Sequence, residues 1–232
     1  MKRIAIFSAV LAAVISAWAE TPTRYELDVK EFYELKVIEG INVNYVCNPD
    51  SAGKAVFTTT SDLASVLMFT NNNGKLEMQI ATDGISYHSL PTVTVYSKFL
   101  TRVENSGDST VKVITVTPCP RFKARLIGNG RLVVRDLNVT TLEADIRTGN
   151  GTLVVNGKCD SAKYNTTGSG VIQADDMEAG NVKCTLAGTG SIGCWTSGKL
   201  SIIGAASGKV HYRGTPTEIK NMSIGVKAEP ID

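Results

Sequence analysis

The sequence has few of the residues that build most metal and nucleophile sites. Its 232 residues include only two histidines, His88 and His211, which lie far apart in the chain. There are five cysteines, but no two of them form a C-x-x-C pair. We therefore expect no metal site and no histidine-activated nucleophile. We also expect no cofactor, because the glycine-rich turns lead into strands, whereas a phosphate-binding loop needs a following helix.

The sequence also lacks an excess of charge, with 24 basic and 22 acidic residues. Two of the basic residues, Lys2 and Arg3, precede a short apolar run at residues 4–15 and a small-x-small site at Ala17-Trp18-Ala19. This pattern is typical of a secretory signal peptide, here residues 1–19. A retained membrane anchor is the alternative, although a bilayer span needs about 20 apolar residues.

Cleavage after Ala19 would leave equal numbers of basic and acidic residues. A neutral chain is a poor partner for nucleic acid, so we expect none. No later segment is apolar enough for a membrane span. The expected location is the periplasm, the outer-membrane surface or the medium. Disulfides are possible there, but five cysteines leave at least one thiol unpaired within the chain.

Glycine turns recur about every twenty residues from residue 105 onward. The four full copies are Gly128-Asn129-Gly130, Gly149-Asn150-Gly151, Gly168-Ser169-Gly170 and Gly188-Thr189-Gly190. Glycine adopts positive φ without steric cost, and Asn, Ser and Thr favour turns. A fixed period of this length indicates stacked repeats.

Each turn is followed by a strand in which apolar residues alternate with polar ones. The positions expected to point inward are Leu132, Val134, Leu153, Val155, Ile172, Ala174, Ile192, Cys194, Val210 and Tyr212. A second alternating strand precedes each turn, as at Phe122, Ala124 and Leu126. Cys184 and Cys194 fall at inward positions, so we interpret them as core residues first and as disulfide partners second.

These features predict an all-β fold, a parallel β-helix-like solenoid. A β-sandwich of successive hairpins is the alternative. Residues 32–100 are less regular, with strands expected at 34–39, 41–46, 55–58 and 75–80, a turn at 71–74, and a helical turn at 61–67 capped by Ser61. This part is expected to cap the solenoid or to form irregular first coils.

Several segments resemble the auto-transporter adhesin head-domain family, the GIN family. They are Phe32-Tyr33-Glu34-Leu35-Lys36-Val37, Glu39-Gly40-Ile41-Asn42-Val43, Asn72-Asn73-Gly74-Lys75-Leu76-Glu77-Met78 and Asn105-Ser106-Gly107-Asp108-Ser109. The resemblance implies a GIN-type domain at 32–215, with an irregular part at 32–100 and regular repeats at 105–213. An extension (20–31) precedes it and a tail or closing strand (216–232) follows. The family is typical of Bacteroidetes, is exported, is similar to right-handed β-helices and offers no catalytic residues.

One outward position is a candidate for binding. Five positions after the second glycine of each turn stand Arg135, Asn156, Asp175, Trp195 and Arg213. We expect them on one flat face, with rungs ~4.8 Å apart. A tryptophan among Asn, Asp and Arg suits stacking on a sugar ring or contact with a protein. An ordinary polar face is the alternative.

Three functions remain open from the sequence. The first is a non-enzymatic binding or adhesion module for a glycan or an envelope or host protein. The second is a carbohydrate-active β-helix enzyme, which would need a cluster of carboxylates in one groove. The third is an envelope or assembly protein that stacks through an uncapped end of the solenoid. The sequence does not specify the oligomeric state.

Overall fold

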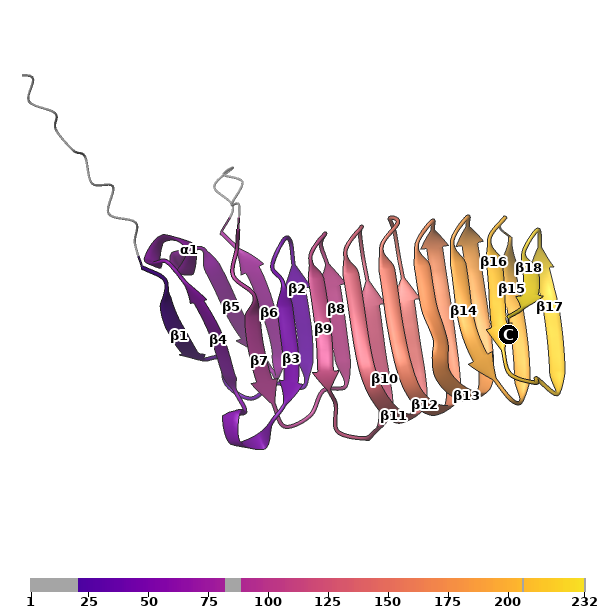
Figure 1. The fold of residues 1–232 in the computed structure, drawn as a ribbon, viewed down its shortest axis with the longest axis horizontal. Coiled ribbons are helices and arrows are strands. Elements are labelled where there is room, and N and C mark those ends of the chain that lie inside the picture. The colour runs from indigo at the N-terminus through magenta and orange to yellow at the C-terminus, as the bar shows by residue number, and fades with distance from the viewer. Residues whose placement is uncertain (1–20, 82–88, 206, 232) are drawn as a thin grey trace, which may run out of the picture.

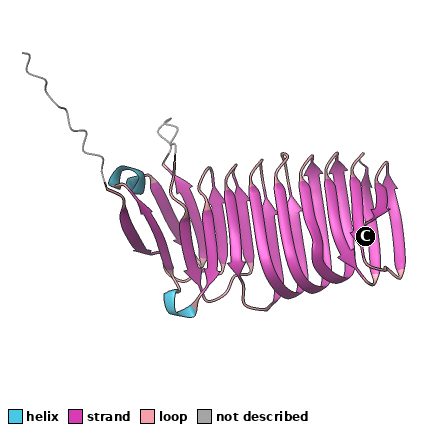
Figure 2. Ribbon diagram, viewed as in Figure 1, coloured by secondary structure: helices cyan, strands magenta, loops and turns pink. Residues whose placement is uncertain are grey.

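The computed structural model describes residues 21–81, 89–205 and 207–231, which form an elongated stack of β-coils (Figure 1). Helix within these residues is confined to a 3-10 helix, η1 (Pro49–Ser51), and to α1 (Ser61–Ser65) (Figure 2). None of these helices could cross a lipid bilayer. The expected signal peptide at 1–19 and His88 lie outside the described residues.

From residue 102 onward each coil is a strand, a glycine turn and a second strand. The strands are β8 (Arg102–Ser106), β9 (Thr110–Thr115), β10 (Cys119–Leu126), β11 (Arg131–Ile146), β12 (Thr152–Gly168), β13 (Val171–Gly188), β14 (Ser191–Thr196), β15 (Lys199–Ala205), β16 (Lys209–Arg213), β17 (Glu218–Ile224) and β18 (Lys227–Pro230). In β11, β12 and β13 the strand after one turn runs on through a bend into the strand before the next turn. Each coil thus contributes to a pre-turn face and a post-turn face.

Strands of the same face pair in parallel from coil to coil. On the pre-turn face β8 pairs with β10, and β10 pairs with the second half of β11. On the post-turn face β9 pairs with the first half of β11. Parallel pairing continues to β17 and β18. The predicted all-β solenoid is confirmed, and the β-sandwich of hairpins is wrong because hairpins would pair antiparallel.

The turns explain the glycine repeat. Gly128 has φ +105°, which a side chain rarely adopts. A Cβ on Gly130 would lie 2.3 Å from the carbonyl oxygen of Gly107 in the preceding coil, so this glycine is needed for close stacking. The residue between the glycines also bonds to the neighbouring coil. The backbone N–H of Asn150 donates to Oδ1 of Asn129 at 3.2 Å.

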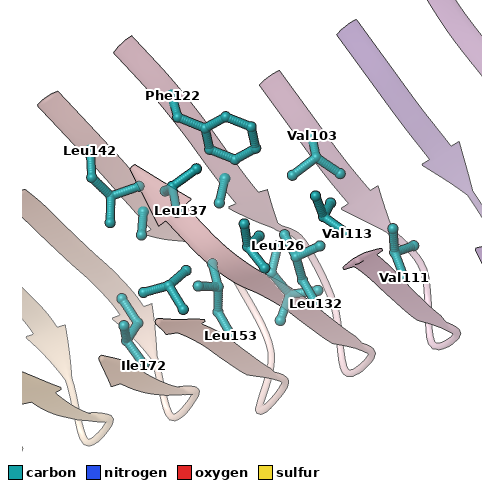
Figure 3. Packing of buried hydrophobic residues seen from close by; sticks show 14 of the residues in the cluster. Val103, Val111, Val113, Phe122, Leu126, Leu132, Leu137, Leu142, Leu153 and Ile172 are labelled. Atoms are coloured by element: carbon teal, nitrogen blue, oxygen red, sulfur yellow. The ribbon is translucent and has the colours of Figure 1, made fainter. Parts of the chain in front are cut away.

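The inward positions predicted from the alternation form one continuous core. Val111, Leu132, Leu153 and Ile172 align on successive post-turn strands and point inward (Figure 3). All are fully buried, and so are Cys184 and Cys194. All five cysteines are free thiols, with Cys159 also buried and Cys47 and Cys119 half-buried. The interpretation of Cys184 and Cys194 as core residues is confirmed.

The N-terminal coils do not stack in sequence order. The strands there are β1 (Thr23–Asp28), β2 (Glu34–Ile38), β3 (Val43–Cys47), β4 (Lys54–Thr59), β5 (Leu67–Asn72), β6 (Lys75–Ile80) and β7 (Val93–Ser97). β2 pairs in parallel with both β6 and β8, and β3 pairs with both β7 and β9. The β2–β3 coil therefore lies between two coils that follow it in the sequence.

Antiparallel strands close the N-terminal end. β5 pairs with β6, β4 pairs with β7, and β1 pairs with β4. The segment therefore forms irregular first coils and also closes the end of the stack, which combines the two expected alternatives. The expected helical turn is present as α1, but its N-cap residue is Thr60 and not Ser61. At the opposite end the segment 216–232, expected as a tail or closing strand, supplies the two strands β17 and β18.

Candidate binding site at the strand bends

The bends between the post-turn and pre-turn faces carry the candidate site. The bends within β11, β12 and β13 each contain a β-bulge, and the bulges differ in length. Pairing skips from Val134 to Leu137 on β11, whereas it skips from Ala174 to Glu178 on β13. A bulge adds residues to one strand that have no partner on the next. From β11 to β14, positions counted from the glycine turn therefore stop aligning beyond the fourth residue, whereas β14 and β16 stay in register.

The neighbours of Trp195 along the stack therefore differ from those predicted by counting five positions after the second glycine of each turn. The structure pairs Asn138 with Lys158, Lys158 with Glu178, Glu178 with Trp195, and Trp195 with Arg213. We call these five residues the bend ladder. The alignment of Trp195 with Arg213 is as predicted, but the neighbour on its other side is Glu178 and not Asp175.

One face of the Trp195 indole is covered and held. The guanidinium carbon of Arg213 lies 6.0 Å from the ring centroid. Arg213 Nη1 donates to Asp176 Oδ1 at 3.1 Å and to the carbonyl of Asp175 at 3.4 Å, which fixes the guanidinium. A Cβ on Gly214, which has φ +91°, would lie 2.7 Å from the indole Cδ1, so only glycine leaves room for the ring.

Trp195 also lines a surface hollow of about 430 Å³. The other lining residues are Lys158, Cys159, Glu178, Ala179, Gly180 and Ser197. Cys159 and Ala179 are buried and give the hollow an apolar floor. Burial, with a smaller contribution from the negative charge of Asp160, raises the pKa of the Cys159 thiol to about 12. This thiol is therefore neutral at physiological pH and offers no nucleophile.

The rim of this hollow carries balanced charge. Lys158 Nζ lies 2.9 Å from Glu178 Oε2, and the two side chains are 77% and 43% exposed. An exposed ion pair of this kind contributes little to stability. It does leave an ammonium and a carboxylate at the surface with no net charge between them.

A second hollow of about 340 Å³ lies next along the bends. It is lined by Pro118, Cys119, Pro120, Asn138, Val139, Thr140 and Asp160. The strand β12 contributes to both hollows, through Lys158 and Cys159 on one side and Asp160 on the other. A third hollow, of about 410 Å³, lies at the N-terminal end between β1 and β5 and includes Leu27 and Phe69.

Comparison with known proteins identifies the family. The family model described as "Putative auto-transporter adhesin, head GIN domain" matches residues 31–216. The chain belongs to this family. No curated protein is similar to it.

Solved structures share the GIN-domain fold. One described as a putative adhesin from Bacteroides fragilis has 17% identity and a TM-score of 0.82, covering 92% of this chain and 98% of its own. Another, described as a putative lipid binding protein from Parabacteroides distasonis, has 20% identity and a TM-score of 0.72, with coverages of 91% and 97%. A putative adhesin from Parabacteroides merdae has 18% identity and a TM-score of 0.68, with coverages of 91% and 97%. At these identities the likeness establishes the fold alone.

The structure gathers most of the predicted binding residues of this GIN-family chain at the bends. Trp195, Arg213 and Asp175 lie together through the contacts above. Asn156 pairs with Asp176, and its Oδ1 accepts the backbone N–H of Asp136 at 2.8 Å. Arg135 is exposed beside Asp136. Sequence reasoning missed Asn138, Lys158 and Glu178, because only the bulge lengths bring them into line with Trp195.

Sequence reasoning also missed a charged network on the outer pre-turn face of the GIN domain. The side chain of Asp145 is fully buried there. Asn165 Nδ2 donates to its Oδ1 at 2.6 Å, and Lys123, Arg125 and Arg147 place nitrogen atoms 3.5–3.6 Å from its Oδ2. Comparison of the repeats does not reveal this network, because the acidic residue is not repeated: the residue that pairs with Asp145 in the next coil is Asn165.

This network bears on the possible chemistry of the molecule. Glu104 contacts Arg102 at 2.9 Å and Arg125 at 3.6 Å. Glu143 forms an ion pair with Lys123. The carboxylates that come together on this face are thus engaged with cations, an arrangement that suits structure better than acid–base work. Among the described residues no group of His, Cys, Asp or Glu is placed to hold a metal ion.

Proposed function

We propose that this chain is an exported, non-enzymatic binding module of the bacterial envelope or surface, and that Trp195 is the centre of its binding site. The observation that carries the proposal is the geometry of Trp195. Its ring is held by Arg213 and Gly214 and also lines a hollow with an apolar floor. A fixed, half-buried indole beside polar groups suits a sugar ring or a protein side chain. Family membership and the adhesin names of the structural neighbours support a surface role.

Replacing Trp195 tests this proposal. We expect Trp195→Ala to abolish binding on a glycan array and to reduce adhesion of beads coated with the protein to cells or matrix, because the stacking surface is lost. Thermal unfolding should show that the variant remains folded. Lys183→Ala, an exposed change on the pre-turn face, is the control and should leave binding intact. Unchanged binding by folded Trp195→Ala would rule out this site.

A second candidate function, self-assembly, is favoured by the C-terminal coil. Every residue of β17 except Ser223 is exposed, and the exposed fractions of Ile219, Met222 and Ile224 are 43%, 62% and 79%. Within the described residues β17 pairs only with β15, so its other edge presents free backbone N–H and C=O groups, apart from the N–H of Ser223, which donates to Asn221 Oδ1. Such an edge pairs readily with another strand. A second copy of this chain presents the same apolar edge, which makes a two-fold contact possible.

A further inference from the structure

The two hollows at the bends lie next to each other along the solenoid axis and are joined by the bend ladder. We call the two hollows together the bend groove: it runs from Trp195 through Glu178 and Lys158 to Asn138, with Asp160 and Thr140 beside the last rung. Successive rungs of a sheet are ~4.8 Å apart, so the ladder from Trp195 to Asn138 spans about 14 Å. This length exceeds one small ring and suits a chain of repeating units parallel to the axis.

The chemistry of the bend groove is mixed rather than apolar. Its floor is formed by small buried side chains, Val139, Cys159 and Ala179. Its rim offers an amide, an ammonium, carboxylates and hydroxyls, which together donate and accept hydrogen bonds. Sugars carry both kinds of group on every ring, and the apolar face of a ring stacks on an indole.

The charges of the groove argue for a neutral ligand. Lys158 is paired with Glu178, and Arg213 is paired with Asp176. Asp160 is exposed and adds a negative charge. A polyanion would meet no net positive potential here, and its affinity would gain nothing from charge attraction.

The backbone of the groove argues against an extended peptide along most of its length. The rungs from Asn138 to Trp195 belong to β11, β12, β13 and β14, whose strands already pair on both sides. At the far end Cys119 of β10 pairs with β11 alone, because β10 pairs with β8 only from Lys123 onward. A peptide that binds as an added strand needs a free edge. A sugar chain needs only side-chain contacts.

We propose that the bend groove binds a neutral linear oligosaccharide laid along the solenoid axis, with one ring stacked on Trp195 and successive units meeting Glu178, Lys158 and Asn138. This inference rests on the proposed binding function and names the ligand class of the same site.

The test uses the dependence of affinity on chain length. The probes are neutral cello-, malto-, manno- and N-acetylchito-oligosaccharides from monosaccharide to hexasaccharide, with polygalacturonate and an unrelated decapeptide pool as comparisons. Calorimetry and the fluorescence of Trp195, the only tryptophan once residues 1–19 are removed, report binding. We expect affinity in one series to rise with each added unit until the ligand reaches Asn138, and then to level off.

A paired substitution separates the groove from the tryptophan alone. Lys158→Ala with Glu178→Ala removes two polar rungs and leaves the net charge unchanged. We expect roughly tenfold weaker binding of the longest oligosaccharide, equivalent to about one or two lost hydrogen bonds, and little change for the monosaccharide. The control is Lys54→Ala with Glu26→Ala, an exposed ion pair at the other end of the molecule, which should leave binding unchanged.

The outcomes distinguish the two proposals. One outcome is sugar binding that requires Trp195 but has an affinity that changes neither with chain length nor with the paired substitution. This result would disprove oligosaccharide binding along the bend groove and leave the proposed binding function intact. Stronger binding of polygalacturonate or of the peptides than of every neutral sugar would also disprove the proposal that the bend groove binds a neutral oligosaccharide. If no probe binds and adhesion is insensitive to Trp195→Ala, both proposals fail.

Discussion

At the scale of single residues, the same residue type has different roles in this molecule. Gly130 lies against the preceding coil, whereas a Cβ on Gly40 would have no atom within 4 Å. The Gly-Ile-Asn triplet that carries the family resemblance therefore does not depend on Gly40 for packing. Ile41 is buried in the core, and Asn42 Oδ1 accepts the N–H of Thr110 in the next coil at 2.9 Å.

Asp145 gives a stability prediction. Asp145→Ala leaves Lys123 and Arg125, which are 24% and 20% exposed, without their shared carboxylate. We expect a loss of about 1–3 kcal/mol in the free energy of unfolding, because the charge-assisted hydrogen bond from Asn165 is lost and Lys123 and Arg125 keep only Glu143 and Glu104 as acidic partners. Urea unfolding measures the change. Glu26→Ala, which breaks an exposed ion pair, is the control. Equal effects of the two substitutions would contradict this account.

Cys159 gives a prediction of pH dependence. Burial raises the pKa of its thiol from about 9 to about 12 in the folded chain. Above pH 9 the unfolded chain loses this proton first, so stability contributed by the neutral thiol is present below pH 9 and is lost as pH rises towards 12. We expect Cys159→Ala to flatten the fall in melting temperature over this range. Parallel curves for the two proteins would show that the thiol makes no contribution.

At the scale of elements, the turn and the bend differ in regularity. The turns repeat closely because the backbone of each turn contacts the backbone of the preceding turn. Only glycine, which has no Cβ, allows this close approach at the same position of every coil. The bends vary because a bulge can hold one or several extra residues without breaking the pairing on either side. Function is proposed at the bends, where the irregularity aligns Trp195 with Glu178.

Gly130 tests the stacking of the turns. A Cβ there would lie 2.3 Å from the oxygen of Gly107 and 2.5 Å from that of Ser109, so the two coils must separate. We expect Gly130→Ala to lower the free energy of unfolding by roughly 1–3 kcal/mol, the usual cost of overpacking. Gly40→Ala is the matched control and should be tolerated. Chemical denaturation compares them, and a harmless Gly130→Ala would show that the coils are not in close contact at this turn.

At the scale of the whole molecule, the two ends of the solenoid differ. Antiparallel β1, β4 and β5 close the N-terminal end, and the β2–β3 coil is enclosed between two later coils. The described C-terminal coil ends in unpaired strand edges with apolar side chains. On β18, Pro230 and Lys227 disfavour pairing with a further strand. The free edge of β17 is therefore the one expected to pair with another chain.

The β17 edge gives a prediction of oligomeric state. We expect dimers whose proportion rises with protein concentration in light scattering coupled to size-exclusion chromatography. Met222→Lys with Ile224→Lys should shift the equilibrium to monomers, because like charges would face each other across the two-fold contact. Leu27→Lys with Met68→Lys, at exposed apolar positions of the N-terminal end, is the control. A protein that stays monomeric at all concentrations would exclude self-assembly through this edge.

The sequence by itself determined the solenoid, its turns and the inward residues of the regular coils. These follow from a strand period of two and a glycine period near twenty, and both depend on neighbours along the chain. Trp195 could be selected as an outward aromatic residue for the same reason, and Arg213 could be placed beside it.

Only the tertiary structure decided the order of the N-terminal coils, the burial of Asp145 and the partners of Trp195 along the bend ladder. Each depends on pairing between distant segments. The β2–β3 coil is enclosed by strands about forty and seventy residues later in the sequence. The bend ladder depends on how many residues each bulge absorbs, which is set by contact with the neighbouring coil and has no periodic signal in the sequence.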